Sequence, residues 1–437
     1  MKLFTLFVAT LAATHMFGQG CFNPPMSFST AYNPVRPIAA DMNNDGAKDV
    51  VFCATLGPVV HLNKGNGVFP LAMTYSANNM SPTRLAIVDL NADGFPDVAT
   101  VRNGTLMINL NDGAGGLLTH QNSTISGVGD IVSADFNLDG KGDLALSSSQ
   151  GLKIVLNNGT PGLSVSSTFT GSGGFLTAAD FNGDGFSDIA GVVGAQTLIT
   201  VWYGTGTGAF ISAVTFPIPI KGYAIASAEV NADGKADLVV SGYSLTVLLS
   251  TGTNSFSALP AFTVTGNCME QVSAGDINAD GNVDLVLPAL LNHSVTVIFG
   301  DGTGNFPSAL SLAASLNSNS AGLTVADFNN NGKPDIASVH QGAQELILLM
   351  DCQTTYLPEN DINNTMVFPL PATDILQFRS DFPITQLRLY DQQGKISERI
   401  IGEDIESLNI SGFPQGCYFL QLFTARGVST RKVIIAR

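Results

Sequence analysis

Short apolar runs alternate with polar, glycine-rich stretches along most of the chain. Runs such as "LAIV" from Leu85 and "LVVSG" from Leu238 are rich in Val, Ile and Leu. They are shorter than typical helices and are bounded by Gly, Asn, Asp and Ser, a pattern that favours strands separated by turns. The pattern therefore predicts an all-β fold.

One nine-residue polar segment recurs seven times, at steps of 45 to 51 residues. An apolar stretch precedes each segment and a strand-like stretch follows it. A further apolar run then leads to a glycine-rich turn that ends in an aromatic residue, for example at Phe69, Phe210, Phe256 and Phe306. A unit of this length with about four short strands is typical of one β-propeller blade. The glycine-rich turns are followed by strands and not by helices, so they are predicted to be hairpin turns and not nucleotide-binding loops.

The last repeat lacks the aromatic-ended turn and the final strand, and a matching piece lies near the N-terminus. The stretch "CFNPPMSFS" from Cys21 aligns without gaps to "VFPLAMTYS" from Val68. We therefore expect an N-terminal strand to complete the last blade and to close the ring, which leaves no open sheet edge. This closure brings Cys21 near Cys352 and predicts a Cys21–Cys352 disulfide.

The other three cysteines, Cys53, Cys268 and Cys417, are expected to be buried thiols outside any disulfide. The cysteine spacings match no zinc pattern.

The recurring segment carries oxygen ligands in an order that suits a hard cation. Oxygens at positions 1, 3 and 5 can converge when the chain turns at Gly in position 6, and a carbonyl at position 7 and a carboxylate at position 9 complete a cage of calcium size. We therefore expect about one Ca²⁺ per blade. The predicted side-chain ligands are Asp41, Asn43, Asp45, Asp49; Asp89, Asn91, Asp93, Asp97; Asp135, Asn137, Asp139, Asp143; Asp180, Asn182, Asp184, Asp188; Glu229, Asn231, Asp233, Asp237; Asp276, Asn278, Asp280, Asp284; and Asp327, Asn329, Asn331, Asp335.

Two other interpretations of these segments differ from a calcium loop of this kind. EF-hands need a Glu at position 12 and flanking helices, whereas position 12 is Phe52 in the first repeat and strands flank the segment. An Asx-rich turn without metal remains the alternative, although several carboxylates so close together repel one another without a counter-ion. Glu229 at position 1 and Asn331 at position 5 depart from the pattern, so we expect weaker binding in those two loops.

The net charge of −16 fits this interpretation, because twenty of the 35 acidic residues lie in the seven segments. An acidic protein of this kind is not expected to bind nucleic acid or an anionic membrane, both of which select for basic surfaces.

The first residues read as an export signal. A single Lys precedes an apolar run and then the small-residue pattern at Gly18–Gly20, so residues 1–20 are predicted to be a secretory signal peptide. A lipoprotein with an acylated Cys21 is the alternative. No later segment is long and apolar enough to predict a transmembrane helix.

The composition changes after residue 352. Residues 353–362 form a polar linker, and residues 363–437 consist of short alternating strands without a calcium loop, which predicts a small β-sandwich. An ordinary immunoglobulin-like accessory module is one interpretation of this segment.

The repeats resemble the FG-GAP/VCBS family, which builds seven-bladed propellers such as the integrin α-subunit head. The resemblance covers roughly residues 21–352, rests on the repeated D-x-N-x-D-G-x-x-D motif, and implies calcium in the blade loops. It implies no particular activity, since the family includes adhesins, lectins and accessory domains of secreted enzymes.

The C-terminal segment resembles the type A sorting domain of type IX secretion, on the stretches "FPLPATDIL", "GCYFLQL" and "RKVIIAR". Leu370 departs from the usual Asn between the two prolines. This resemblance implies contact with the type IX secretion machinery, export across the outer membrane, and release or attachment at the cell surface.

No catalytic arrangement is evident in the sequence. The histidines His15, His61, His120, His293 and His340 are scattered singly, and neither HExxH nor GxSxG occurs. The leading hypothesis is a secreted or cell-surface, calcium-stabilised propeller that acts as a non-enzymatic binding or adhesion module for an extracellular protein or glycan, as a monomer.

The alternatives are a glycan-binding lectin or a polysaccharide-degrading enzyme that uses a propeller face. Repeated aromatic positions at the blade junctions would favour a lectin, because sugars stack on aromatic side chains. The sequence shows no such series. Trp202, the single tryptophan, is expected to lie in the core.

Overall fold

A computed structural model describes residues 22–436 except 24, 31–32, 71, 75–81, 119–120, 161–162, 172–173, 194–195, 212, 264–270, 290–293, 314–319, 352–365, 370–371, 381, 392–395 and 425–426. Two compact units are present. One includes Met26–Leu349, and the other includes Met350–Arg437 together with Cys21–Pro25. All regular elements of the described residues are strands, which confirms the predicted all-β class. In the same residues no helix of a length and hydrophobicity suited to crossing a membrane is found.

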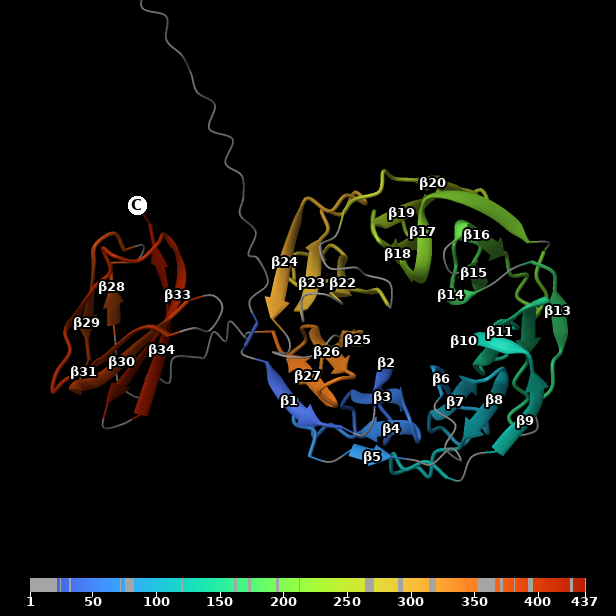
Figure 1. Ribbon diagram of the computed structural model, residues 1–437, viewed down its shortest axis with the longest axis horizontal. Coiled ribbons are helices and arrows are strands. Elements are labelled where there is room, and N and C mark those ends of the chain that lie inside the picture. Colours follow the sequence, from blue (N-terminus) through green and yellow to red (C-terminus); the bar gives the residue numbers. More distant parts are fainter. Residues whose placement is uncertain are drawn as a thin grey trace, which may run out of the picture. The chain divides into compact units, whose positions relative to one another are not determined.

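The first unit consists of antiparallel sheets whose strands mostly follow one another in sequence (Figure 1). We call the four-stranded segment that carries the nth Asp-rich loop blade n. The loop lies between the first and second strands of each blade. Grouped by sheet, the strands are β2 (Val35–Ala40), β3 (Asp49–Ala54), β4 (Gly57–His61), β5 (Ala72–Thr74); β6 (Arg84–Val88), β7 (Asp97–Arg102), β8 (Thr105–Asn109), β9 (Gln121–Ser126); β10 (Val128–Ala134), β11 (Asp143–Ser148), β12 (Gly151–Val155), β13 (Ser167–Phe169); β14 (Phe175–Ala179), β15 (Asp188–Val192), β16 (Gln196–Trp202), β17 (Val214–Ala228), β18 (Asp237–Gly242), β19 (Leu245–Ser250), β20 (Phe256–Ala258); β21 (Ser273–Gly275), β22 (Asp284–Ala289), β23 (Ser294–Phe299), β24 (Ser308–Ala313); and β25 (Ser320–Ala326), β26 (Asp335–His340), β27 (Glu345–Leu349), β1 (Met26–Ser29).

The blades are arranged in a closed ring. Their first strands contact one another in the order β2, β6, β10, β14, β17, β21 and β25, and β25 in turn contacts β2 (Figure 1). The N-terminal strand β1 pairs antiparallel with β27, with Met26 opposite Leu348 and Phe28 opposite Leu346. The predicted closure of the last blade by the N-terminal strand is therefore confirmed.

One strand differs from the expected repeat. Strand β17 runs without a turn over 15 residues, from the outer edge of blade 4 to the inner edge of blade 5. It pairs with β16 and with β18, so these two blades form one seven-stranded sheet. The register shifts between Gly222 and Ala224, and this bulge lets the strand bend from one blade into the next.

The second and third strands of the blades hold much of the core. Every residue of β3, β11, β18 and β26 is buried, as expected for strands covered on both faces. Trp202 is completely buried and its Nε1 donates a hydrogen bond to the carbonyl of Thr170 at 2.9 Å, which confirms the prediction that it packs in the core. Cys53 is likewise a buried thiol outside any disulfide, as predicted.

The remaining cysteines give a mixed result. Cys417 is half-buried, so the prediction of a fully buried thiol is wrong at this position, where β33 has its less covered face. Cys268 lies outside the described residues. So do Cys21 and Cys352 with their predicted disulfide, and residues 1–20 with the predicted signal peptide.

His61, at the end of β4, is a buried polar group inside the propeller core. It is 1% exposed, neither ring nitrogen has a hydrogen-bond partner among the described residues, and its ring lies 5.6 Å from Phe52 and 6.2 Å from Phe69. Burial lowers its pKa to about 4 from the usual 6.5. The corresponding residue is apolar in most other blades, for example Trp202 in blade 4.

We expect His61 to make the protein less stable in mild acid. Its folded pKa lies below the unfolded value, so the unfolded chain takes up the proton first as the pH falls through 6.5. Protonation linked to His61 alone should then lower the free energy of unfolding by about 2 kcal/mol between pH 7 and pH 5, against the opposite contribution of buried carboxylates such as Asp188, whose pKa burial raises to about 7. Urea unfolding of wild type and His61→Phe at both pH values measures this. The variant should lack this part of the pH dependence, and an equal change of the free energy of unfolding in both proteins would contradict the prediction.

The second unit is a sandwich of two sheets. One sheet contains β28 (Met366–Phe368), β29 (Ile375–Arg379) and β32 (Ser407–Asn409), and the other contains β31 (Ile396–Ile401), β30 (Ile384–Tyr390), β33 (Gly416–Thr424) and β34 (Gly427–Ile435). Leu376 and Leu408 from the first sheet share one core with Leu387 and Leu420 from the second. The predicted C-terminal β-sandwich is confirmed.

Candidate metal centre and the blade junctions

The seven Asp-rich loops share one backbone conformation. The Gly at position 6 has φ between 83° and 91° in every loop, a region that favours glycine. Position 4 is also left-handed, and in six loops it is a residue other than Gly with φ between 55° and 59°: Asn44, Ala92, Leu138, Ala232, Ala279 and Asn330. Ala and Leu rarely adopt this conformation, so interactions within the loop must hold the backbone in place.

The side chains at positions 1, 3 and 5 supply those interactions, as loop 2 illustrates. The backbone N–H of Asp93 is shared by Asp89 Oδ1 at 3.3 Å and Asn91 Oδ1 at 3.1 Å. The N–H groups of the next two residues donate to Asp89 Oδ2 and Asp93 Oδ1, both at 2.9 Å. These three side chains are exposed or half-buried, so the structure brings oxygens of the first three predicted ligands together at the surface.

The loops that depart from the motif keep this hydrogen-bond pattern. In loop 5, Glu229 accepts from the N–H groups of Asp233 and Gly234, as Asp does elsewhere. In loop 7, Asn331 accepts from the N–H of Lys333, but its Nδ2 is buried and lacks a partner among the described residues. The predicted weaker metal binding of these two loops stays a prediction.

The carboxylate at position 9 lies deeper than the other predicted ligands. Asp97 is 0% exposed, and its two oxygens accept backbone hydrogen bonds from Leu90 at 2.8 Å and from Asn111 at 2.7 Å. The same arrangement recurs at Asp49, Asp143, Asp188, Asp237 and Asp284. Burial raises the pKa of Asp97 to about 6 and that of Asp188 to about 7. Position 9 thus joins the loop to the chain at the end of the third strand.

Replacing Asp97 by Ala should destabilise the protein whether or not calcium is present. The change leaves two buried N–H groups, of Leu90 and Asn111, without an acceptor, at a cost of about 2–4 kcal/mol in the free energy of unfolding. The matched control is Asp93→Ala in the same loop, whose carboxylate is exposed. Urea unfolding in EDTA should show a large loss for Asp97→Ala and a small one for Asp93→Ala. Equal losses in EDTA would contradict the structural role of position 9.

The donors of each loop fit a hard cation in chemistry and in order. Carboxylate and amide oxygens from positions 1, 3 and 5 share a tight turn, and the predicted ligand atoms include no nitrogen or sulfur. Among the described residues no three His, Cys, Asp or Glu side chains are grouped so that they could hold a metal alone, so a cage needs the Asn oxygen and a backbone carbonyl as well. In loops 3 and 5 a Lys at position 7 lies 3.6 Å and 3.3 Å from the position 5 carboxylate, and so partly balances its charge.

Loops 1, 2 and 7 also contact the neighbouring blade through their backbone. Asn63 Nδ2, in blade 1, donates to the carbonyl of Phe328 in loop 7 at 2.6 Å, a contact that spans the ring closure. Asn111 and Asn157 bind Met42 and Asp89 in the preceding loops in the same way, at 2.7 and 2.8 Å. The sequence analysis missed these residues, although an Asn 22 positions after the start of the loop in repeats 1 to 3 is a visible signal.

The aromatic residues that end the glycine-rich turns act as wedges between blades. Phe69 packs edge-to-face on Phe328 of the preceding loop at 5.9 Å and on Phe28 at 5.4 Å. Phe210 packs on Phe136 and Phe169, and Phe256 on Phe181 and Phe216, at 5.3–5.8 Å. Repeated aromatic positions therefore do exist at blade junctions, contrary to the sequence analysis. Because Phe69, Phe136, Phe181, Phe210 and Phe328 are at most 7% exposed, they provide packing and not surfaces for sugars.

Comparison with known proteins agrees with this architecture. Residues 41–100, 89–146, 135–191, 180–240 and 230–287 match the FG-GAP-like repeat, and residues 366–436 match the secretion system C-terminal sorting domain. No relative was found among curated proteins.

Solved structures show the fold alone. BBS1N in complex with ARL6DN has a TM-score of 0.55 at 9% identity, covering 77% of this chain and 99% of that one. An Agrocybe aegerita lectin, described as recognising non-reducing terminal N-acetylglucosamine, has 0.49 at 18% identity, covering 64% and 80%. The extracellular domain of BT4673 from B. thetaiotaomicron has 0.48 at 10%, covering 95% and 59%.

The sorting domain directs secretion through the type IX system to the cell surface or the extracellular space. The FG-GAP matches together span more than half of the chain. The chain therefore belongs to the FG-GAP-like repeat family and carries a secretion system C-terminal sorting domain.

Proposed function

We propose that the protein is a secreted, seven-bladed propeller whose Asp-rich loops bind calcium and which acts as a non-enzymatic binding or adhesion module. The observation that carries the proposal is the shared loop geometry. The same left-handed turn, with carboxylate and amide oxygens at positions 1, 3 and 5, recurs next to each of the blade junctions described above. Bound calcium would supply positive charge that balances the loop carboxylates.

The proposal of a binding module rests on the same geometry. The polar loop side chains form hydrogen bonds within their own loops, and the aromatic side chains between the blades are buried. Both features therefore stabilise the ring of blades. Recognition is then left to the surface loops between strands, which a rigid scaffold holds in place. The partner would be an extracellular protein or glycan that the secreted protein meets outside the cell, and contact with the secretion machinery is assigned to the C-terminal sandwich.

Counting bound calcium tests the metal sites directly. Elemental analysis of the purified protein after dialysis against calcium should give five to seven ions per chain. Asp93→Ala, which removes one exposed loop carboxylate, should hold one ion fewer. Asn331→Asp, which restores the motif in loop 7, should hold loop 7 calcium more tightly than wild type. No bound calcium in any of the three proteins would refute the metal sites while leaving the fold untouched.

A further inference from the structure

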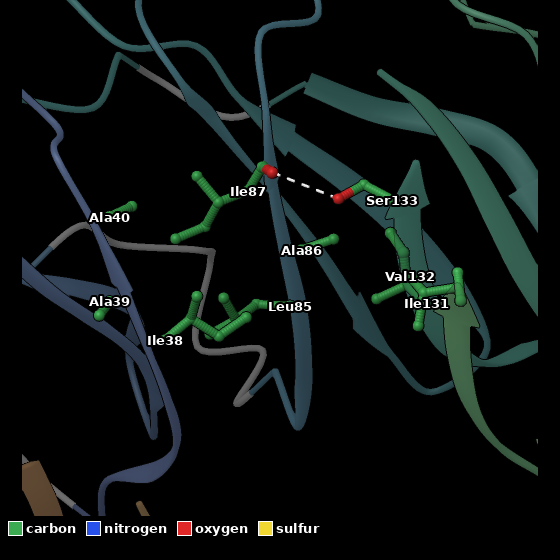
Figure 2. A pocket seen from close by; sticks show the side chains of 10 residues that line it. Ile38, Ala39, Ala40, Leu85, Ala86, Ile87, Ile131, Val132 and Ser133 are labelled. Atoms are coloured by element: carbon green, nitrogen blue, oxygen red, sulfur yellow. Dashed lines mark hydrogen bonds between the residues drawn. The ribbon is translucent and has the colours of Figure 1, made fainter. Parts of the chain in front are cut away.

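The cavity between the first strands of the blades is lined by apolar side chains. Figure 2 shows Ile38 of β2, Leu85 of β6 and Ile131 of β10 in this lining. Among the described residues that line it, Ser133 has the single polar side chain, and its hydroxyl already donates to the carbonyl of Ile87 at 3.3 Å. A polar group with unused chemistry lies instead in loop 7.

The side chain of Asn331 places a nitrogen where the other loops have an oxygen. In loops 1, 2, 3, 4 and 6 the second carboxylate oxygen of the Asp at position 5 accepts a hydrogen bond from the Asn amide at position 3, at 2.8–3.2 Å. In loop 7 the corresponding atom is Asn331 Nδ2, which cannot accept. It is buried without a hydrogen-bond partner among the described residues, and Asn329 donates to Asp335 at 3.4 Å instead. An oxygen in place of this nitrogen would gain a donor.

Asn331 is followed by Gly332, a sequence that favours loss of the side-chain amide. Because glycine has no Cβ, its backbone nitrogen can reach the side-chain carbonyl carbon of the preceding Asn and close a five-membered ring. Gly332 is exposed with φ of 83°, and a Cβ at this position would meet nothing within 4 Å. The ring therefore has room to form, and water can reach it.

The groups around the Asn331 amide are placed for this reaction. The N–H of Gly332 donates to Asp327 Oδ2 at 2.6 Å, so a carboxylate is in position to take the proton from the attacking nitrogen. The backbone N–H of Lys333 donates to Asn331 Oδ1 at 2.8 Å and stabilises the negative charge that develops on this oxygen. The nitrogen that must leave is the one that no hydrogen bond holds.

We propose that Asn331 is a self-modification site, at which the amide is converted to a carboxylate. The Gly332 nitrogen bonds to Asn331 Cγ while Asp327 takes up its proton. The Cγ–Nδ2 bond then breaks, and the nitrogen leaves with that proton as ammonia, which leaves a succinimide. Water opens the bond between Cγ and the Gly332 nitrogen, gives an aspartate and restores the N–H of Gly332. The reaction consumes one water, releases one ammonia and needs no oxidant or cofactor.

The product has a direct consequence for loop 7. An aspartate at position 331 gives this loop the complete motif of loops 1 to 4 and 6. The loop lies at the ring closure, where the carbonyl of Phe328 accepts hydrogen bonds from Asn63 and Gly67. Tighter calcium binding there rests on the proposed function, whereas the conversion of Asn331 does not.

The Asn182–Gly183 pair in loop 4 provides a matched control inside the same protein. The N–H of Gly183 also donates to a carboxylate, Asp180 Oδ1, at 2.7 Å. The amide nitrogen of Asn182, however, donates to Asp184 at 2.8 Å and to Asn254 at 2.9 Å. The base is present but the leaving nitrogen is held, so Asn182 should keep its amide longer.

The Asn158–Gly159 pair, which follows β12, is a control for the base. The side-chain oxygen of Asn158 accepts the N–H of Thr160 at 3.1 Å, as the equivalent oxygen does in loop 7. The N–H of Gly159 donates to the neutral amide oxygen of Asn157 at 2.8 Å and not to a carboxylate. This pair should also react slowly.

Peptide mass spectrometry of the purified full chain over time tests the proposal. The protein is kept in calcium-free buffer below its melting temperature, so that no metal engages Asp327. We expect the mass gain of an amide-to-acid exchange to appear roughly tenfold or more faster at Asn331 than at Asn182 and Asn158. Asp327→Asn should slow the exchange at Asn331 about a hundredfold. In urea, which needs no variant, Asn331 should lose its lead, since the three pairs then differ little in structure.

The product and the calcium affinity complete the test. Cleavage by a protease specific for aspartate should show a normal aspartate at position 331, and aged wild type should approach Asn331→Asp in calcium affinity. An intact Asn331, equal rates at the three pairs, a faster reaction in folded Asp327→Asn, or isoaspartate as the main product would each overturn the proposal. Conversion without a change in calcium affinity would uphold the modification and contradict calcium binding by loop 7.

Discussion

Removal of calcium is expected to lower the stability of the propeller more than any single substitution. For a loop with a dissociation constant of about 10⁻⁴ M, in the range of extracellular calcium modules, 1 mM calcium contributes about 1.4 kcal/mol to the free energy of unfolding. Several occupied loops together would contribute several kcal/mol, which corresponds to a fall in melting temperature of roughly 10 °C or more on chelation. The carboxylates at positions 1 and 5, no longer balanced by a cation, would also repel one another.

Thermal unfolding in EDTA and in 1 mM calcium measures this effect. Restoring calcium should restore the melting temperature, whereas the same concentration of magnesium should restore much less, because magnesium demands a smaller octahedral cage. Asp93→Ala should show a smaller response to EDTA than wild type. Coincident unfolding curves with and without calcium would favour the metal-free Asx-rich turn, in which hydrogen bonds such as that from Gly94 N–H to Asp89 are sufficient.

Phe69→Ala is expected to cost about 3–5 kcal/mol, the largest effect of a single substitution at a blade junction. Phe69 is 3% exposed and packs against Phe28, His61 and Phe328. The change opens a cavity between blade 1 and blade 7, next to β1, which is joined to β27 by strand pairing and not by a continuous chain. Loss of this wedge should therefore loosen the closure itself.

The neighbouring residue provides the control. Val68 is 40% exposed, and Val68→Ala should change the free energy of unfolding by less than about 0.5 kcal/mol. Urea unfolding measures both variants, and hydrogen exchange of β1 and β27 tests whether the closure opens in Phe69→Ala. A loss at Phe69 no larger than that at Val68 would show that the wedge contributes little to the junction.

The repeat pattern made much of the fold predictable from the sequence. Apolar runs of strand length between turn residues indicated an all-β chain, and the spacing of the Asp-rich segments marked the blades. The alignment of the stretch around Phe28 with that around Tyr75 predicted the pairing of β1 with β27. The local alternation of residues indicated a strand, and the last repeat lacked the final strand that it needed. The same local logic predicted the burial of Trp202 and the sandwich of residues 363–437.

Other features depended on contacts between distant residues, which local patterns do not encode. Asp97 is buried because its two carboxylate oxygens accept hydrogen bonds from two backbone segments, at Leu90 and at Asn111. These segments come together only when the blade is formed. The continuous strand β17 has no turn signal, so its path from blade 4 to blade 5 follows from the curvature of the ring.

The sequence by itself determined the β class, the repeat, the order of the Asp and Asn side chains in each loop and the two-part organisation, since each follows from residue types at fixed local spacing. The tertiary structure alone decided which aromatic side chains face a neighbouring blade and are buried, as with Phe69 and Phe328. It also decided that Arg36, Arg84 and Phe175, from three separate repeats, meet in one cluster. The physical reason is the ring, which brings the first strands of all repeats to one central space regardless of their separation along the chain.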